Sequence, residues 1–210
     1  MNDFSALMRF IYTAEKLKAE LRHSWTSRTE RQESVAEHSW LMALIAMAIF
    51  DSLDVKVDQL RVLKMVALHD LAEAITGDIP SFDTSGRRDN KYQNEHDAMQ
   101  KITADLPAKT AAEFMELWEE VEAKQTPEAM LAQCLDKIEV LIEHIIADIS
   151  TWDEGDYSLG PYNKEDYFDF NPYVREFKDH VNLLFWEKME TAGVMQHVPE
   201  THKARRKQTK

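Results

Sequence analysis

The sequence has very little of what disulfide-linked, all-β or membrane-spanning proteins require. Its 210 residues include one cysteine, five glycines and six prolines. The single Cys134 excludes an internal disulfide and any zinc site built from cysteines. So few turn-forming residues disfavour a sandwich or a barrel, which needs many turns. No apolar run reaches the length that a membrane-spanning helix needs, so we expect no membrane partner.

Positive charge is also scarce. The chain carries 25 Lys and Arg against 38 Asp and Glu, for a formal net charge of −13. This balance disfavours a nucleic-acid partner, because phosphate backbones are held by basic surfaces. A small phosphorylated substrate remains compatible, since a metal ion and one or two arginines supply positive charge locally. The first residues lack the apolar core of a signal peptide, so we expect a soluble cytoplasmic protein.

Helical patterns are what the sequence contains instead, and they predict an all-α, single-domain protein. Ser34 to Glu37 has the pattern of a capping box, and Thr126-Pro127 that of a helix start. The predicted domain covers residues 1–195, with a C-terminal helical extension over 151–195 and a basic flexible tail over 196–210. The acidic and aromatic segment 151–172 fits a lid, a subunit contact or an ordered surface loop. The spacing of apolar residues predicts helices over 4–21, 34–50, 58–74, 87–105, 108–123, 126–149 and 173–191.

Three polar side chains lie on apolar helix faces. His38 shares a face with Val35 and Met42, and by itself it is typical of a buried histidine with one hydrogen-bond partner. The doublet His69-Asp70 lies within another apolar run. Burying an imidazole beside a carboxylate costs several kcal/mol, on the order of the polar-transfer penalty, unless something pairs with both. A divalent cation pairs with both at once.

Two further carboxylates follow the doublet. Glu73 is expected on the same side of the helix, at i+4 from His69 and i+3 from Asp70. Asp78 comes just past the helix end, in the turn from Gly77 to Pro80. Together with His38, these residues form a set suited to a catalytic metal with open positions. The alternative at this point is a polar network that stabilises helix ends.

Two strings resemble a known family. Glu33 to Ser39 (ESVAEHS) and His69 to Pro80 (HDLAEAITGDIP) are similar to the HD-domain metal-dependent phosphohydrolases. More narrowly, they resemble the branch of the bacterial 5′-deoxynucleotidases and their eukaryotic HD-domain relatives, over about residues 10–150. The resemblance implies an HD-type helical bundle that releases phosphate from 2′-deoxyribonucleoside 5′-monophosphates.

The resemblance also implies a ligand set. It makes His38, His69, Asp70 and Asp136 the ligands of a divalent metal. Periodicity alone would leave Asp136 as a solvated carboxylate, because it lies away from the apolar stripe of its helix. Binuclear relatives add histidines between the doublet and the last aspartate. Only one histidine, His96, lies between residues 70 and 136, so we expect a single metal ion. This ion could be Mn, Co, Fe, Ni, Zn or Mg.

Catalytic and substrate-binding roles are likewise implied by the resemblance. Glu73 matches the residue that orients or deprotonates the attacking water, and Asp78 matches a candidate acid near the sugar. Arg22 and Trp25 match an arginine and a tryptophan of the substrate pocket. They are three positions apart, as in the eukaryotic-type relatives, which leaves base preference open. Either Arg22 or Arg28 could clamp the phosphate, and Trp25 could stack on a base or pack against the first helix.

Two rival functions remain. One is an HD-type hydrolase of another nucleotide or small phosphate ester. The other is a non-catalytic, metal-stabilised helical adaptor. A homodimer is compatible with either. Three other histidines, His23, His144 and His180, are more typical of surface or satisfied core positions than of ligands.

Overall fold

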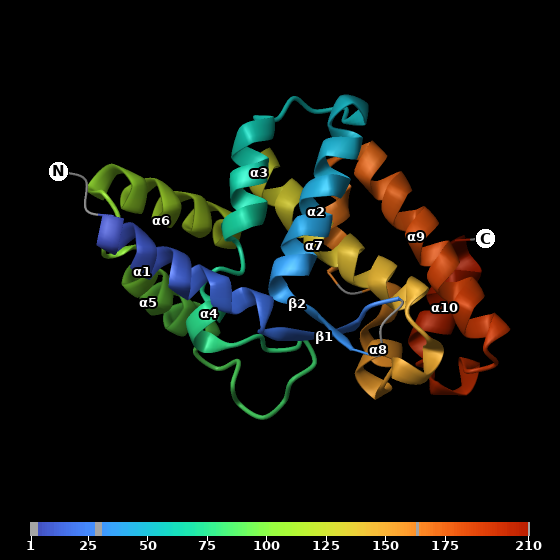
Figure 1. The fold of residues 1–210 in the computed structure, drawn as a ribbon. Coiled ribbons are helices and arrows are strands. Elements are labelled where there is room, and N and C mark those ends of the chain that lie inside the picture. Colours follow the sequence, from blue (N-terminus) through green and yellow to red (C-terminus); the bar gives the residue numbers. More distant parts are fainter. Residues whose placement is uncertain (1–3, 28–30, 163, 210) are drawn as a thin grey trace.

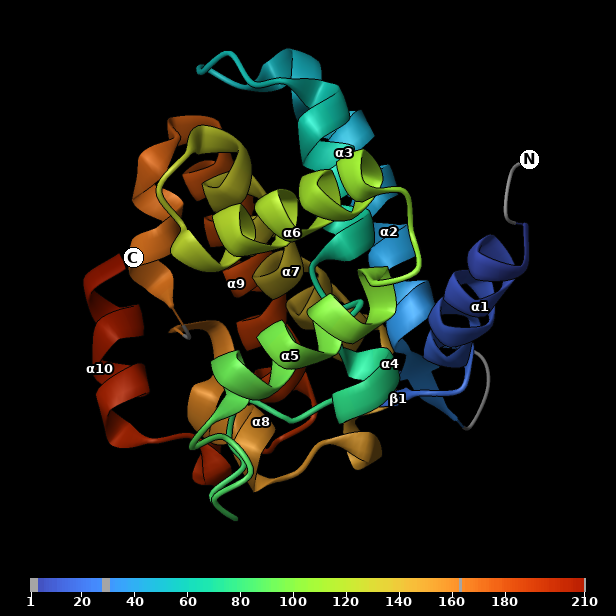
Figure 2. The same cartoon turned by 90° about the vertical axis from the view of Figure 1, so that its left-hand side faces the viewer.

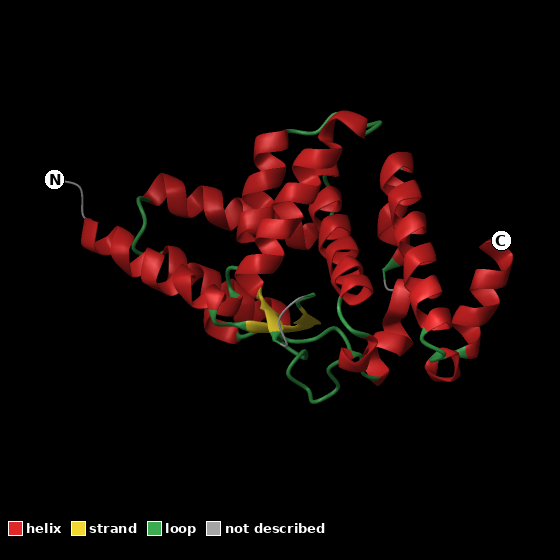
Figure 3. Ribbon diagram, turned by 45° about the vertical axis from the view of Figure 1, so that its right-hand side comes forward, coloured by secondary structure: helices red, strands yellow, loops and turns green. Residues whose placement is uncertain are grey.

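The computed structural model describes residues 4–27, 31–162 and 164–209. Within them the chain forms a single, mostly helical domain with one small hairpin, as predicted from composition (Figures 1 and 3). The elements are α1 (Phe4–Ala14), η1 (Glu15–Lys18), β1 (Leu21–Trp25), β2 (Gln32–Ser34), α2 (Val35–Ile49), η2 (Phe50–Ser52), α3 (Gln59–Leu68), α4 (Glu73–Thr76), α5 (Lys91–Thr103), α6 (Ala108–Ala123), α7 (Pro127–Ile146), η3 (Ile149–Thr151), α8 (Glu154–Leu159), η4 (Gly160–Tyr162), η5 (Glu165–Phe170), α9 (Pro172–Thr191), η6 (Met195–His197) and α10 (Glu200–Thr209).

Helix α7 is the centre of the bundle. It packs against α2, α3, α6 and α9, and Figure 2 shows α6 crossing in front of it. Its apolar residues Leu131, Leu135 and Ile138 are fully buried. The helix starts where the sequence predicts, because the Thr126 hydroxyl accepts the Ala129 N–H at 3.2 Å. It ends at Ile146 rather than at residue 149.

Helix α2 begins at the predicted capping box. The Glu37 N–H donates to the Ser34 hydroxyl at 3.3 Å, and the Ser34 N–H donates back to the Glu37 carboxylate at 3.0 Å. The box closes the first turn, so His38 enters the core at the fourth position of the helix. Val35–Ser52 is the one described segment with the length and hydropathy to cross a membrane. It buries Val35, Met42 and Ile49 in the bundle core.

The predicted helix over 58–74 is wrong near its C-terminal end. Helix α3 ends at Leu68, and α4 begins at Glu73 after a tight turn. In this turn the His69 imidazole Nδ1 donates to the Val66 carbonyl at 2.8 Å. An unbroken helix would direct the Asp70 N–H to that carbonyl. In an unbroken helix the Glu73 N–H would donate to the His69 carbonyl. It donates to the Asp70 carbonyl at 3.0 Å, as in a 3₁₀ turn.

Two other segments differ from their predicted conformations. Residues 15–34 are not a helix followed by a loop: η1 leads into an antiparallel hairpin that pairs Leu21 with Ser34 and Trp25 with Gln32. The basic tail, for which composition predicts disorder, forms α10. The Arg206 guanidinium lies 4.9 Å from the centre of the Trp186 ring, a contact that composition alone does not reveal.

The acidic and aromatic segment forms α8, η4 and η5. η5 packs on α7 and α9, and α8 packs on η6, so the segment is an ordered part of the domain. Its Trp152 indole N–H donates to the His144 carbonyl at 3.1 Å, near the end of α7. This contact places α8 beside the hairpin strand β1, next to the cavity described below.

Candidate metal centre and active site

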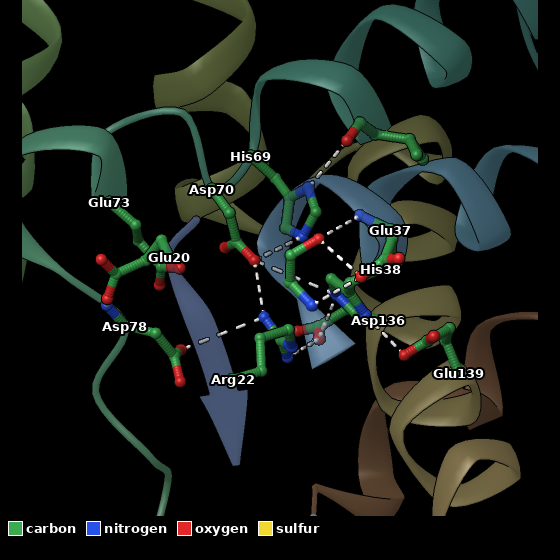
Figure 4. Close-up of polar contacts among 12 residues, drawn as sticks. Glu20, Arg22, Glu37, His38, His69, Asp70, Glu73, Asp78, Asp136 and Glu139 are labelled. Atoms are coloured by element: carbon green, nitrogen blue, oxygen red, sulfur yellow. Dashed lines mark hydrogen bonds and ion pairs between the residues drawn. The ribbon is translucent and has the colours of Figure 1, made fainter. Parts of the chain in front are cut away.

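The four predicted metal ligands come from three separate segments and converge (Figure 4). His38 lies in the first turns of α2, His69 and Asp70 lie in the turn after α3, and Asp136 lies in α7. The His69 Nε2 is 3.1 Å from Asp70 Oδ2. The His38 Nε2 is 3.4 Å from Asp136 Oδ1 and 3.9 Å from Asp70 Oδ2. Two imidazole nitrogens and two carboxylates therefore face a common point.

The chemistry of these groups fits a divalent cation. The Nε2 atoms of His38 and His69 are both buried, and neither has a hydrogen-bond partner. A buried ring nitrogen without a partner carries a desolvation cost of about 1–3 kcal/mol. A metal ion between them would bond to both lone pairs and balance Asp70 and Asp136. His69 is already oriented for this, since its Nδ1 donates to the Val66 carbonyl.

His38 is oriented by a buried carboxylate. Its Nδ1 donates to Glu139 Oε2 at 2.5 Å, and both side chains are completely buried. Glu139 follows Asp136 by three positions, so α7 would supply one predicted ligand and the group that orients another. Behind them lies Glu33 of β2, where burial and the charge of Glu139 raise the pKa of the Glu33 carboxyl to about 9. The Glu33 carboxyl therefore holds a proton at neutral pH and adds no second negative charge beside Glu139.

Glu139→Gln should weaken metal binding about 10- to 100-fold, the usual effect of removing the carboxylate that orients a histidine ligand. The amide keeps the volume but loses the charge that favours Nδ1–H on His38. Isothermal titration of metal-free protein measures the change in affinity. Glu176→Gln, an exposed glutamate on α9, is the matched control. Unchanged affinity in Glu139→Gln would contradict this role.

Arg22 of β1 lies among the carboxylates of the centre. Its Nη1 donates to Asp70 Oδ2 at 2.9 Å and lies 4.0 Å from Asp78 Oδ1, while its Nη2 lies 3.8 Å from Asp136 Oδ1. Burial opposes its charge, but these carboxylates hold the pKa of Arg22 above its usual value. Its Nε is buried without a partner. The guanidinium is therefore a fixed positive charge beside the predicted metal, with a donor still free.

Glu73 and Asp78 lie on one side of Asp70 in Figure 4. Burial raises the pKa of Glu73 to about 9, and the charges of Asp70 and Asp78 add to the effect. Its Oε1 lies 3.7 Å from the Lys91 ammonium. Burial also raises the pKa of Asp78. Both carboxyls therefore bind a proton more strongly than exposed ones do, which suits acid or base roles.

The turn that carries Asp78 is held by Glu20. The Asp78 N–H donates to Glu20 Oε1 at 2.9 Å. Gly77 has a φ of +74°, and a Cβ at this position would lie 3.2 Å from the same oxygen. A side chain at Gly77 would be strained and would press on Glu20. The backbone conformation of this turn therefore explains why a glycine precedes Asp78 in the HD motif.

A cavity of about 120 Å³ adjoins the centre. Arg22 and Asp78 line it together with Ile79 and Pro80 of the following turn. Phe82, Leu141 and Phe185 add apolar surface, and His23, His144 and Asp156 add polar groups. Trp25 is half-buried and is not among the lining residues, so the structure does not bring it into this cavity. Arg28 lies outside the described residues.

Several residues of this region are not predicted from the sequence. Lys137 lines the cavity and donates to Asp136 Oδ2 at 2.7 Å. Glu139 is recognisable only as a carboxylate one helical turn after Asp136, and Glu20 carries no signal at all. His23 directly follows Arg22 and lines the cavity beside it. Its position next to Arg22 is the available signal, although its pattern by itself is more typical of a surface or satisfied core histidine.

Comparisons with known proteins agree with the geometry. The model of the HD domain family matches residues 14–176. The chain is 34% identical over 140 residues to the 5′-deoxynucleotidase HDDC2 of Mus musculus, covering 66% of this chain and 68% of that one. It is 36% identical over 138 residues to the protein of the same name from Danio rerio, covering 65% and 67%.

A solved structure shares the whole fold. A protein from Magnetospirillum magnetotacticum MS-1, described as a predicted metal-dependent phosphohydrolase, superposes with a TM-score of 0.77 at 26% identity. The match covers 93% of this chain and 97% of that one. With the family match over residues 14–176 and the convergent His and Asp side chains, the chain belongs to the HD-domain family of metal-dependent phosphohydrolases, in the branch of the 5′-deoxynucleotidases.

Proposed function

We propose that the protein is a phosphomonoesterase that releases phosphate from 2′-deoxyribonucleoside 5′-monophosphates, with one divalent ion held by His38, His69, Asp70 and Asp136. The observation that carries this proposal is the position of Arg22. Its guanidinium contacts Asp70 at the centre and also lines the adjoining cavity. A phosphate can thus meet the arginine while the rest of the substrate enters the cavity. The relatives named 5′-deoxynucleotidases support the same substrate class.

The chain's own residues divide the work around the phosphate. When bound, a divalent ion supplies Lewis acidity toward a phosphoryl oxygen and offsets negative charge in the transition state. Arg22 binds the phosphate through charge-assisted N–H donors. Glu73 orients or deprotonates the attacking water, the role that the family resemblance implies. Asp78, whose pKa is also raised, donates a proton to the leaving oxygen.

The cavity fits the nucleoside end of such a substrate. Its walls combine apolar side chains such as Phe82 and Leu141 with a few polar groups, the usual composition of small-molecule sites. The turn from Gly77 to Pro80 forms its edge next to the centre, where a sugar attached to the phosphate would lie. We expect this turn to leave no room or no partner for a 2′-hydroxyl. Trp25 does not line this cavity, so we do not expect it to stack on the base.

The enzyme should prefer dAMP over AMP and over 3′-dAMP by about 10²-fold or more, the range for a hydroxyl that a site fails to accommodate. Release of inorganic phosphate under one metal measures all three rates. Equal rates on dAMP and AMP would leave only a general HD phosphohydrolase.

Product analysis separates the remaining alternatives. Pyrophosphate or a ring-opened monophosphate would identify another HD-type hydrolase, whereas tightly bound metal without hydrolysis would identify an adaptor. A cytoplasmic location and a homodimer remain predictions from the sequence. Exposed apolar side chains on α1 and α2, including Phe4, Tyr12 and Trp40, are available for a subunit contact.

A further inference from the structure

A second group of metal-binding side chains lies on the far wall of the cavity. We propose that His23, His144 and Asp156 form a second cation site, which takes a divalent transition-metal ion such as Zn²⁺, Ni²⁺ or Co²⁺. His23 comes from β1, His144 from the last turn of α7 and Asp156 from α8. Their potential ligand atoms all lie within 4.8 Å of one another. The group shares no residue with the HD centre.

Asp156 contacts both histidines of the group. Its Oδ2 lies 3.0 Å from His23 Nε2, and its Oδ1 lies 2.8 Å from His144 Nε2. Each histidine thus presents its Nε2 to a different oxygen of one carboxylate. Cis ligands of an octahedral ion with bonds of about 2.0–2.1 Å are about 3 Å apart, so these spacings suit one. Asp153 Oδ2, at 3.6 Å from His23 Nε2, offers a further oxygen.

The hydrogen bonding of His144 directs its Nε2 at a carboxylate. Its Nδ1 is 2.6 Å from the Val140 carbonyl, which only accepts, so Nδ1 must carry a proton. In the neutral tautomer, Nε2 then directs a lone pair at the Asp156 carboxylate. Two acceptors at 2.8 Å repel unless a proton or a metal ion lies between them. His69 at the HD centre has the same arrangement, with Nδ1 on the Val66 carbonyl and Nε2 on a carboxylate.

The surroundings hold the three side chains in place. The Asp153 N–H donates to Asp156 Oδ2 at 2.8 Å, as part of the capping box of α8. The ring of Phe82 contacts the His23 ring edge to face, with centres 4.8 Å apart. Phe82 in turn lies against Gly155, where a Cβ would approach its ring to 2.6 Å. The site is therefore organised before a ligand arrives, which favours binding.

The charges and donor types select the class of ion. Two imidazoles and one carboxylate are the donors that zinc, nickel and cobalt prefer, whereas magnesium prefers oxygen alone. His144 and Asp156 are buried, while His23 is half-buried and lines the cavity. Open coordination positions would thus face the cavity.

Metal stoichiometry tests the site directly. Metal-free protein titrated with Ni²⁺ in a calorimeter, and analysed for metal after desalting, should bind two equivalents. Asp156→Asn and His144→Gln should each bind one, and His180→Gln, an exposed histidine of α9, should still bind two. Asp70→Asn should keep the second equivalent, because the two groups share no ligand. His23→Gln, at a half-buried position, should also lose one equivalent and serves if the buried variants fail to fold.

Two results would overturn the proposal. Uptake of a single equivalent by the wild-type protein would mean that protons alone hold His144 and His23 to Asp156. Two equivalents in both Asp156→Asn and His23→Gln would place the second ion elsewhere. Neither result depends on which phosphate ester the protein hydrolyses, so the second site and the proposed function fail separately.

Discussion

Asp70→Ala is expected to abolish phosphate release, to leave the protein without its HD-centre metal and to lower its thermal stability. Asp70 Oδ2 lies 3.1 Å from His69 Nε2 and accepts from Arg22 at 2.9 Å. Without this carboxylate, the buried His38 and His69 lose the common partner that links them. Because binding free energy is also folding free energy at such a site, loss of metal lowers stability. His69→Ala should behave in the same way.

Metal content of the purified variant and its melting temperature, with and without added metal, measure these effects. Added metal should raise the melting temperature of the wild type. The melting temperature of Asp70→Ala should rise by less, because metal can bind this variant only outside the HD centre. Asp54→Ala removes an exposed carboxylate and is the matched control. The same comparison is made in a protein in which Asp156 is also replaced, which removes the other candidate site. If Asp70→Ala and His69→Ala then still bind as much metal as the protein without these two substitutions, the HD centre is disproved.

Glu73→Ala is expected to keep the metal and to lose about 10²- to 10⁴-fold in rate, the range for a positioned acid or base. Glu73 is 3% exposed, and its Oε2 is buried without a partner. Its Oε1 lies 3.7 Å from the Lys91 ammonium, and Figure 4 shows it on the side of Asp70 that faces away from His38. Removing it should therefore affect proton transfer rather than metal binding.

Glu73→Gln provides a sharper version of the same experiment. The amide keeps the shape and hydrogen-bonding capacity but cannot take a proton, so its rate should be as low as that of the alanine variant. Steady-state rates on dAMP and metal analysis of the same samples decide the result. Loss of activity together with loss of metal would make Glu73 a ligand instead.

Some features follow from short stretches of sequence because their causes are local. The capping box at Ser34 and the helix start at Thr126 depend on hydrogen bonds within three or four residues, so the sequence predicts them correctly. The apolar faces around His38 and His69 likewise reveal that these side chains point inward. The break after Leu68 is not predicted, because the apolar pattern continues through the turn in which the His69 ring donates to the Val66 carbonyl.

The site itself needed the tertiary structure. Periodicity places Asp136 in solvent, and only the packing of α2 on α7 brings it to 3.4 Å from His38. Glu139 meets His38 across 101 positions, and Asp156 meets His23 across 133. No local pattern encodes such pairs, because their partners are chosen by how the helices pack. The sequence by itself thus determined the fold class, the starts of α2 and α7 and the HD doublet. Packing decided which distant carboxylates complete the metal centre and which residues line the cavity beside it.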